Sequence, residues 1–132
     1  MSASPALAYD YAWLRVVPDV TTGAGEPVGV LVQCRQGGFL GLRVREDLAA
    51  LAARWPGLDA DLLGRALAAL ARVAQGGPGA APIGLLPPSE RFHWLTATRS
   101  TVLQPSAVHT GLTRDPAATL EALFARLGAP AS

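Results

Sequence analysis

The side chains best suited to chemistry gather in residues 89–111, which hold both histidines of the chain and two arginines, Arg91 and Arg99. The imidazoles of His93 and His109 titrate near neutral pH, and a guanidinium holds phosphate or carboxylate with two parallel hydrogen bonds. Such a set could move protons and bind an anion without a metal, as phosphodiester transfer requires. The alternative is structural, because two histidines on separate segments are more often hydrogen-bonded residues of the fold.

The hydroxyls and the lone thiol of the chain add little to this chemistry. Ser100, Thr101 and Ser106 would be nucleophiles only beside a base, and no GxSxG motif presents them, so they are more typical of turns. Cys34, His93 and His109 do not have the close spacing of metal ligands. We therefore expect neither a metal nor a cofactor.

A second group of candidates is aromatic and basic. Tyr11, Trp13 and Arg15, with Arg43 and Arg45, could form a stacking face for single-stranded nucleic acid on a sheet. The formal net charge of +1 gives little attraction for a polyanion, so nucleic acid is the less favoured partner. Ordinary sheet packing or a contact in a homo-oligomer would use the same residues.

Composition narrows the class of protein. The chain has 132 residues, enough for one domain over 1–132, with residues 1–8 and 129–132 expected to be flexible ends. It has no lysine, which excludes a Schiff base. Only 16% of residues are charged and 50% are hydrophobic, which indicates either a surface buried against a partner or, equally, the many alanines, which pack in helices as easily as they lie exposed. The start of the chain has no signal peptide pattern and no later run could span a bilayer, so we expect a cytoplasmic protein.

The hydrophobic pattern sets out the elements that must position these residues. Two strands are expected to flank the turn RQGG, because its glycines can adopt the positive φ of a tight hairpin. Apolar residues at helical spacing in the middle and at the end of the chain indicate amphipathic helices. The patterns predict strands at 9–18, 28–34, 39–45, 92–97 and 101–104, and helices at 48–55, 59–75 and 115–127.

These elements predict an α+β fold with a single antiparallel sheet of about five strands and helices packed on one face. Gln33, Arg43 and Arg45 would then line the other face, with Tyr11, Trp13 and Arg15. An open sheet face that carries aromatic residues is more often a contact surface than a solvent-facing one.

Three stretches carry a resemblance to a known family: YDYAWLRVVPDV, LVQCRQGGFLGLRV and ERFHWLTATRSTVLQPSAVHTGLTRDP. They resemble the bacterial domain of unknown function 3037 family over about residues 9–127. The family has no established activity, and its genes often neighbour a HipA-like kinase gene, so the resemblance implies such a kinase as a partner. Ala24 and Pro27 stand where the family commonly has Glu and Asn, and Thr98 and Ala107 where it usually has proline.

The favoured hypothesis is a non-enzymatic protein-interaction or regulatory domain. Its contact surfaces would be the loop of residues 98–111 and the sheet face with Arg43 and Arg45, and Trp94 would be an anchor. The alternatives are the phosphate-handling enzyme and, third, a single-stranded nucleic-acid binder. The candidate binding residues are Arg43, Arg45, Trp94, Arg99, Ser100, Thr101, Gln104, Ser106 and His109.

Overall fold

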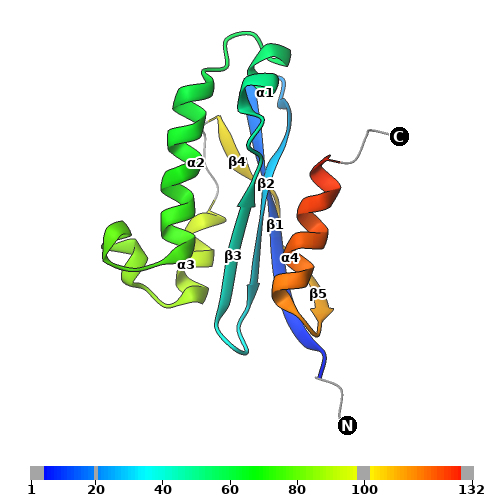
Figure 1. Ribbon diagram of the computed structural model, residues 1–132, viewed down its shortest axis with the longest axis vertical. Helices are drawn as coiled ribbons and strands as arrows, with labels where there is room; N and C mark the ends of the chain where they lie inside the picture. The colour runs from blue at the N-terminus through cyan, green and yellow to red at the C-terminus, as the bar shows by residue number, and fades with distance from the viewer. Residues whose placement is uncertain (1–4, 20, 98–101, 129–132) are drawn as a thin grey trace.

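A computed structural model describes residues 5–19, 21–97 and 102–128, which form one antiparallel sheet with helices on both of its faces (Figure 1). The strands are β1 (Leu7–Asp19), β2 (Ala24–Cys34), β3 (Phe39–Val44), β4 (Leu103–Pro105) and β5 (His109–Thr113). The helices are α1 (Leu48–Arg54), α2 (Ala60–Gln75), α3 (Pro88–Leu95) and α4 (Pro116–Ala125). Short 3₁₀ turns η1 (Pro78–Ala80), η2 (Ile83–Leu85) and η3 (Arg126–Gly128) complete the described elements. The predicted α+β class with five antiparallel strands is confirmed.

The sheet has the order β3-β2-β1, and β4 and β5 both pair with the far edge of β1. β1 and β2 are long, and their register shifts between Leu14 and Arg15, opposite Pro27. Proline cannot donate to a ladder, so it is found at such irregularities. The second strand was predicted to begin at residue 28, but β2 already begins at Ala24.

One face of the sheet packs against α1, α2 and α3. The apolar stripe of α2 is buried here as predicted, with Leu63, Leu67 and Leu70 against Leu14 and Leu31 of the sheet. Asp59 caps α2 by accepting a hydrogen bond from the Leu62 N–H group at 3.1 Å. This layer holds the larger of the two hydrophobic cores.

The other face is partly covered by α4, so the prediction of helices on one face only was wrong. Leu120 and Leu123 of α4 pack on Val30 and Val32 of β2. Figure 1 shows α4 and the pair α2–α3 on opposite sides of the sheet. The apolar stripe of this helix could be recognised in the sequence, but a stripe does not say which face of a sheet it will cover.

Two elements near the histidines differ from the prediction. Residues 92–97 were predicted to be a strand, but α3 occupies 88–95, with Pro88 in its first turn and Phe92 and Leu95 buried one turn apart. Phe92 and Trp94 are two residues apart, which is the spacing of one face of a strand. The helix is short and buries few residues, so its own period was not evident. The fifth strand is β5, inside and just beyond the predicted loop of 98–111.

Two further observations concern the start of the described chain and the hydropathy of its helices. β1 begins at Leu7, inside the segment expected to be a flexible end. Among the described residues, no helix combines the length and the apolar character needed to cross a bilayer.

Candidate binding face

The structure separates the two histidines considered for catalysis. His93 is exposed on α3, which packs on the face that holds α1 and α2. His109 pairs with Tyr11, whose side chain lies on the opposite face with α4. The phosphodiester hypothesis requires the two imidazoles to converge on one cleft. In the structure they lie on opposite faces of the sheet and do not converge. Arg99 lies outside the described residues.

Arg91 has a structural role. Its side chain is buried and donates hydrogen bonds to three backbone carbonyls, those of Leu86 at 2.9 Å, Val73 at 2.9 Å and Ala74 at 2.6 Å. Val73 and Ala74 are in the last turn of α2, where carbonyls have no partner within the helix. Arg91 thus ties α3 to the end of α2 and is not available to a substrate.

The other residues predicted to bind a partner are scattered. Trp94 is 39% exposed on α3, whereas Gln104 is half-buried in β4. The Ser106 hydroxyl accepts a hydrogen bond from the Trp13 N–H group at 2.9 Å, and the Ser106 N–H group donates to the Trp13 carbonyl at 2.8 Å. Ser106 therefore joins β1 where β4 gives way to β5. Ser100 and Thr101 lie outside the described residues.

Arg43 and Arg45 line a hollow of about 440 Å³ beside Phe124, but both are paired within the chain. Arg43 forms an ion pair with Glu121 of α4, and its guanidinium lies 4.3 Å from the centre of the Phe124 ring. Arg45 donates to Glu26 at 2.9 Å and to both oxygens of Asp47. Gln33, predicted on the same face, is buried on the opposite side and donates to Asp10 at 3.1 Å.

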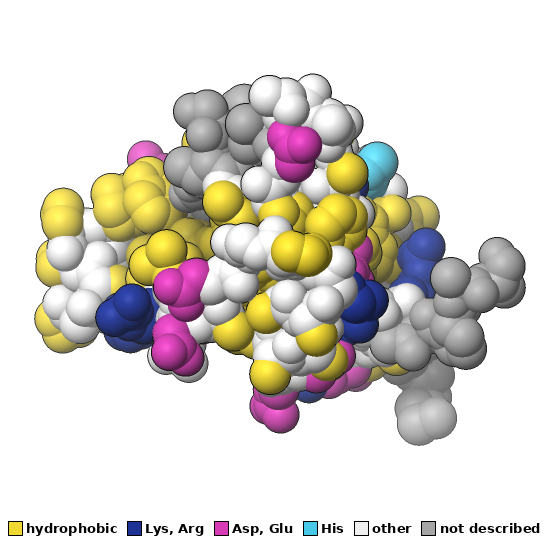
Figure 2. Space-filling model, turned by 90° about the horizontal axis from the view of Figure 1, so that it is seen from above, with side chains coloured by type: hydrophobic (Ala, Val, Ile, Leu, Met, Phe, Trp, Pro, Cys, Tyr) yellow, Lys and Arg dark blue, Asp and Glu magenta, His cyan; other side chains and the backbone are white. Residues whose placement is uncertain are grey.

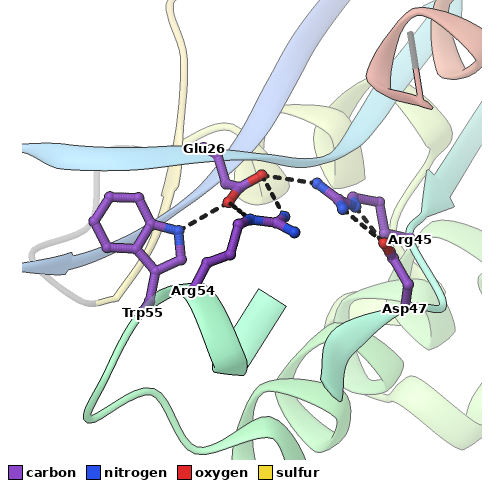
Figure 3. A network of polar contacts seen from close by, with 5 residues as sticks. All are labelled: Glu26, Arg45, Asp47, Arg54 and Trp55. Carbon is purple, nitrogen blue, oxygen red and sulfur yellow. Dashed lines mark hydrogen bonds and ion pairs between the residues drawn. The ribbon is translucent and has the colours of Figure 1, made fainter. Parts of the chain in front are cut away.

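Sequence reasoning missed Glu26, which is the centre of a polar network (Figure 3). Its carboxylate accepts hydrogen bonds from Arg45, from two nitrogens of Arg54 and from the indole N–H group of Trp55 at 2.8 Å. These groups come from the residue after β3, from α1 and from the residue after α1, so Glu26 joins three parts of the chain.

The network shifts the acidity of its members. Desolvation raises the pKa of Glu26, but the hydrogen bonds from Arg54, Trp55 and Arg45 outweigh it, so that the pKa lies below its ordinary value of 4.5. The hydrogen bonds from Arg45 likewise lower the pKa of Asp47. The hydrogen bond with Asp47 and then that with Glu26 raise the pKa of Arg45. All three groups are therefore held in their charged forms, which is a structural arrangement and not one suited to proton transfer.

A row of rings lies on the α4 side of the sheet, over β1 and β5. Tyr9 and Tyr11 are stacked with ring centres 5.8 Å apart, Tyr11 meets Trp13 edge-on at 6.0 Å, and His109 lies over Tyr11 at 5.2 Å. These four residues are called the aromatic strip below. The three β1 rings pack against the edge of the core that α4 forms with β2 and are half-buried, and His109 is exposed. The main contacts of α4 are with β2 and β3, so this part of the face is only partly covered.

Two arginines stand at the Trp13 end of the aromatic strip. The guanidinium of Arg126 lies 5.4 Å from the centre of the Trp13 ring, a cation–π contact. Arg15 and Arg126 line a shallow hollow of about 240 Å³ together with Trp13, Pro27 and Leu127. Among the described residues neither arginine forms an ion pair, in contrast to Arg43 and Arg45.

A larger hollow, of about 470 Å³, lies between the turn after α1, the start of α2 and β4. Its lining is mostly apolar and includes Leu62, which is 59% exposed, and Val102, which is 40% exposed. Figure 2, which views the molecule from above this end, shows hydrophobic side chains gathered on it and a few charged ones between them. Among its lining residues that the structure describes, Asp59 is the one titratable group, and the rest offer mainly apolar burial. In the described part of the chain no three His, Cys, Asp or Glu side chains are grouped as metal ligands.

Comparison with known proteins places the chain in a family. A family model described as "Protein of unknown function (DUF3037)" matches residues 11–127. The chain belongs to this family. The DUF3037 match covers β1 from Tyr11, all other strands, all four helices and most of η3, so that Trp13 and His109 of the aromatic strip lie within it. No curated protein and no solved structure gives a significant match to this DUF3037 chain.

Proposed function

We propose that this DUF3037 protein is a non-enzymatic binding domain that docks a partner protein on the aromatic strip and its two flanking arginines. The observation that carries the proposal is the row of Tyr9, Tyr11, Trp13 and His109, left half-buried or exposed on the part of the sheet beside α4. Tyrosine, tryptophan and arginine are the residue types that contribute most binding energy in protein interfaces. The separation of His93 from His109 supports binding over catalysis.

A protein partner is favoured over nucleic acid by the charges around the strip. Arg15 and Arg126 are the two cations that line the hollow at the Trp13 end of the strip, and the chain as a whole carries a formal charge of only +1. A single strand of nucleic acid needs a row of cations along its backbone in addition to stacking rings. A protein surface needs only a few large side chains and a small charged rim.

The test compares two single variants on opposite faces. Tyr11→Ser removes the central ring of the strip, and Trp94→Ser removes the exposed ring of α3. Each tagged variant and the unaltered chain are used to capture proteins from the native host, with quantitative mass spectrometry as the readout. A HipA-like kinase, implied by the family resemblance, is the first purified partner to test by calorimetry.

We expect Tyr11→Ser to reduce the amount of partner captured at least about tenfold, as for a central interface residue. Trp94→Ser should leave the amount captured unchanged. The opposite result would move the docking site to α3. Equal capture by all three proteins would reject the aromatic strip as a docking surface. Circular dichroism of each variant confirms that it is folded before binding is compared.

A further inference from the structure

The outer edge of β5 has no partner strand among the described residues. The direction of its backbone groups follows from β1. In β1 the N–H group of Val17 bonds to the Val102 carbonyl, and the Trp13 carbonyl accepts from the Ser106 N–H group, so the odd-numbered residues of β1 point towards β4 and β5. Backbone groups alternate in direction along a strand, and Tyr9 pairs with Gly111. Thr110 and Leu112 therefore direct their N–H and C=O groups outward.

The side chains of β5 do not protect this edge. Natural sheets guard exposed edges with charged residues, proline or a covering helix. β3, at the opposite edge, has Arg43 and is flanked by α2 on one face and α4 on the other. β5 reads HTGLT, has no charged residue or proline, and carries Leu112 at 74% exposure. The β5 edge is thus open to an added strand.

We propose that a second copy of this chain fills the edge, by antiparallel pairing of the two β5 strands. The two outward residues, Thr110 and Leu112, are placed symmetrically about Gly111. A two-fold axis through Gly111 sets Thr110 of each copy opposite Leu112 of the other, so that both hydrogen-bonded pairs form at once. Gly111 brings no side chain to the axis, and Leu112 of each copy covers Thr110 of its neighbour. This self-complementarity favours a second copy over an unrelated strand.

The pairing has a geometric consequence for the molecule. An axis perpendicular to the sheet keeps both copies of α4 on the same face and joins the two sheets into one. The two aromatic strips then lie on the same face, on either side of the new strand pair. The dimer does not depend on the function proposed above, but it would present two docking strips to a single partner assembly.

The first experiment measures the mass of the full chain by sedimentation velocity from about 5 µM to about 1 mM, because so short an interface is expected to be weak. We expect the mass to rise from 13.6 kDa towards twice that value. Leu112→Arg should remain monomeric over the same range, since it places a charge on the paired edge. Leu62→Arg, an equally drastic change at an exposed leucine of α2, should dimerise like the unaltered chain.

The second experiment tests the register by oxidative cross-linking. Paired residues in this geometry have Cα atoms about 5.5 Å apart, within the reach of a disulfide. A mixture of the Thr110→Cys and Leu112→Cys chains should give covalent dimers at least about tenfold faster than either variant alone, because the proposed register sets each cysteine opposite the other only in the mixture.

A chain that stays monomeric to about 1 mM, or that offers β5 only to a different protein, overturns the proposal. So does a dimer that Leu112→Arg leaves intact, because it would use another surface. Cross-linking of either variant alone, without enhancement in the mixture, would reject the two-fold axis at Gly111. Loss of partner binding in Tyr11→Ser with dimerisation unchanged would show that the strip and the edge act separately.

Discussion

The two halves of the α4 face differ in what completes them. Over β2 and β3, α4 buries Val30 and Val32, and Arg43 is neutralised by Glu121. Over β1 and β5, the rings of the aromatic strip stay half-buried or exposed, and Arg15 and Arg126 form no ion pair among the described residues. The first half is covered by α4, whereas the rings of the second half remain partly accessible to solvent.

This difference indicates which half of the face contributes to stability and which half can contribute to binding. Apolar area removed from water and paired charges stabilise the fold, so the β2–β3 half contributes to the free energy of unfolding. Rings left partly in water contribute less to folding and can contribute to association. Variants in the covered half should therefore change stability, and variants in the open half should change binding.

Two glycines on this face provide the sharpest contrast and the largest expected effect. A Cβ atom at Gly41 would lie 2.6 Å from Leu120 of α4 and 3.0 Å from the Phe39 ring. Because Leu120 is buried, Gly41→Val must push α4 away from β3, and we expect a loss of about 2–3 kcal/mol in the free energy of unfolding. Denaturant titration measures the loss.

The matched control is Gly111→Val, in the open half. Its Cβ atom would lie 2.7 Å from the Tyr9 ring, but that ring is half-buried and can rotate into solvent. We expect a loss below about 1 kcal/mol. Equal losses at the two glycines would show that the two halves are packed equally well, contrary to the comparison.

The sequence could predict elements whose signals are local. The RQGG hairpin followed from two adjacent glycines, and Gly37 and Gly38 both have positive φ. The buried stripe of α2 followed from spacing alone, and the spacing left Asp59 and Asp61 as alternative caps, of which Asp59 is the one used. Such signals need no knowledge of which segments meet in space, and these predictions were confirmed.

The remaining features depend on contacts between distant residues. Glu26 binds side chains 19 to 29 positions away, and nothing near it in the sequence marks it as a centre. β5 has few apolar residues, so its pattern is that of a loop until β1 is available to pair with it. The pairing of Arg43 with Glu121 likewise required the position of α4 to be known.

The Glu26 network gives the second prediction, of intermediate size. Glu26→Gln removes the negative charge that pairs with both Arg45 and Arg54. The Glu26 side chain is only 25% exposed, so solvent screens these ion pairs incompletely. We expect a loss of about 1–2 kcal/mol, as for a partly buried, charge-assisted hydrogen-bond network. Thermal and denaturant unfolding measure it, with Glu46→Gln, at an exposed residue outside the ion pairs described, as the control. An equal loss for both variants would remove the network as the cause.

The same network predicts a dependence of stability on pH. Because the pKa of Glu26 is lower in the folded state than its ordinary value of 4.5, the carboxylate contributes its full stability above that pH. The contribution is lost as the pH falls through the folded-state pKa. The stability difference between the unaltered chain and Glu26→Gln should therefore shrink below about pH 4.5. A difference that stays constant down to pH 2–3 (roughly, below any ordinary carboxyl pKa) would contradict this account.

The smallest effect on stability is expected at Arg126. Its guanidinium contacts the half-buried Trp13 ring and forms no ion pair among the described residues, so Arg126→Ala should change the free energy of unfolding by less than about 0.5 kcal/mol. The indole resonance of Trp13 should nevertheless shift in a two-dimensional NMR spectrum, while that of Trp55, bonded to Glu26, should not. A substantial loss of stability would mean that Arg126 completes the fold as Arg43 does, and the open half would then be closed by its own chain.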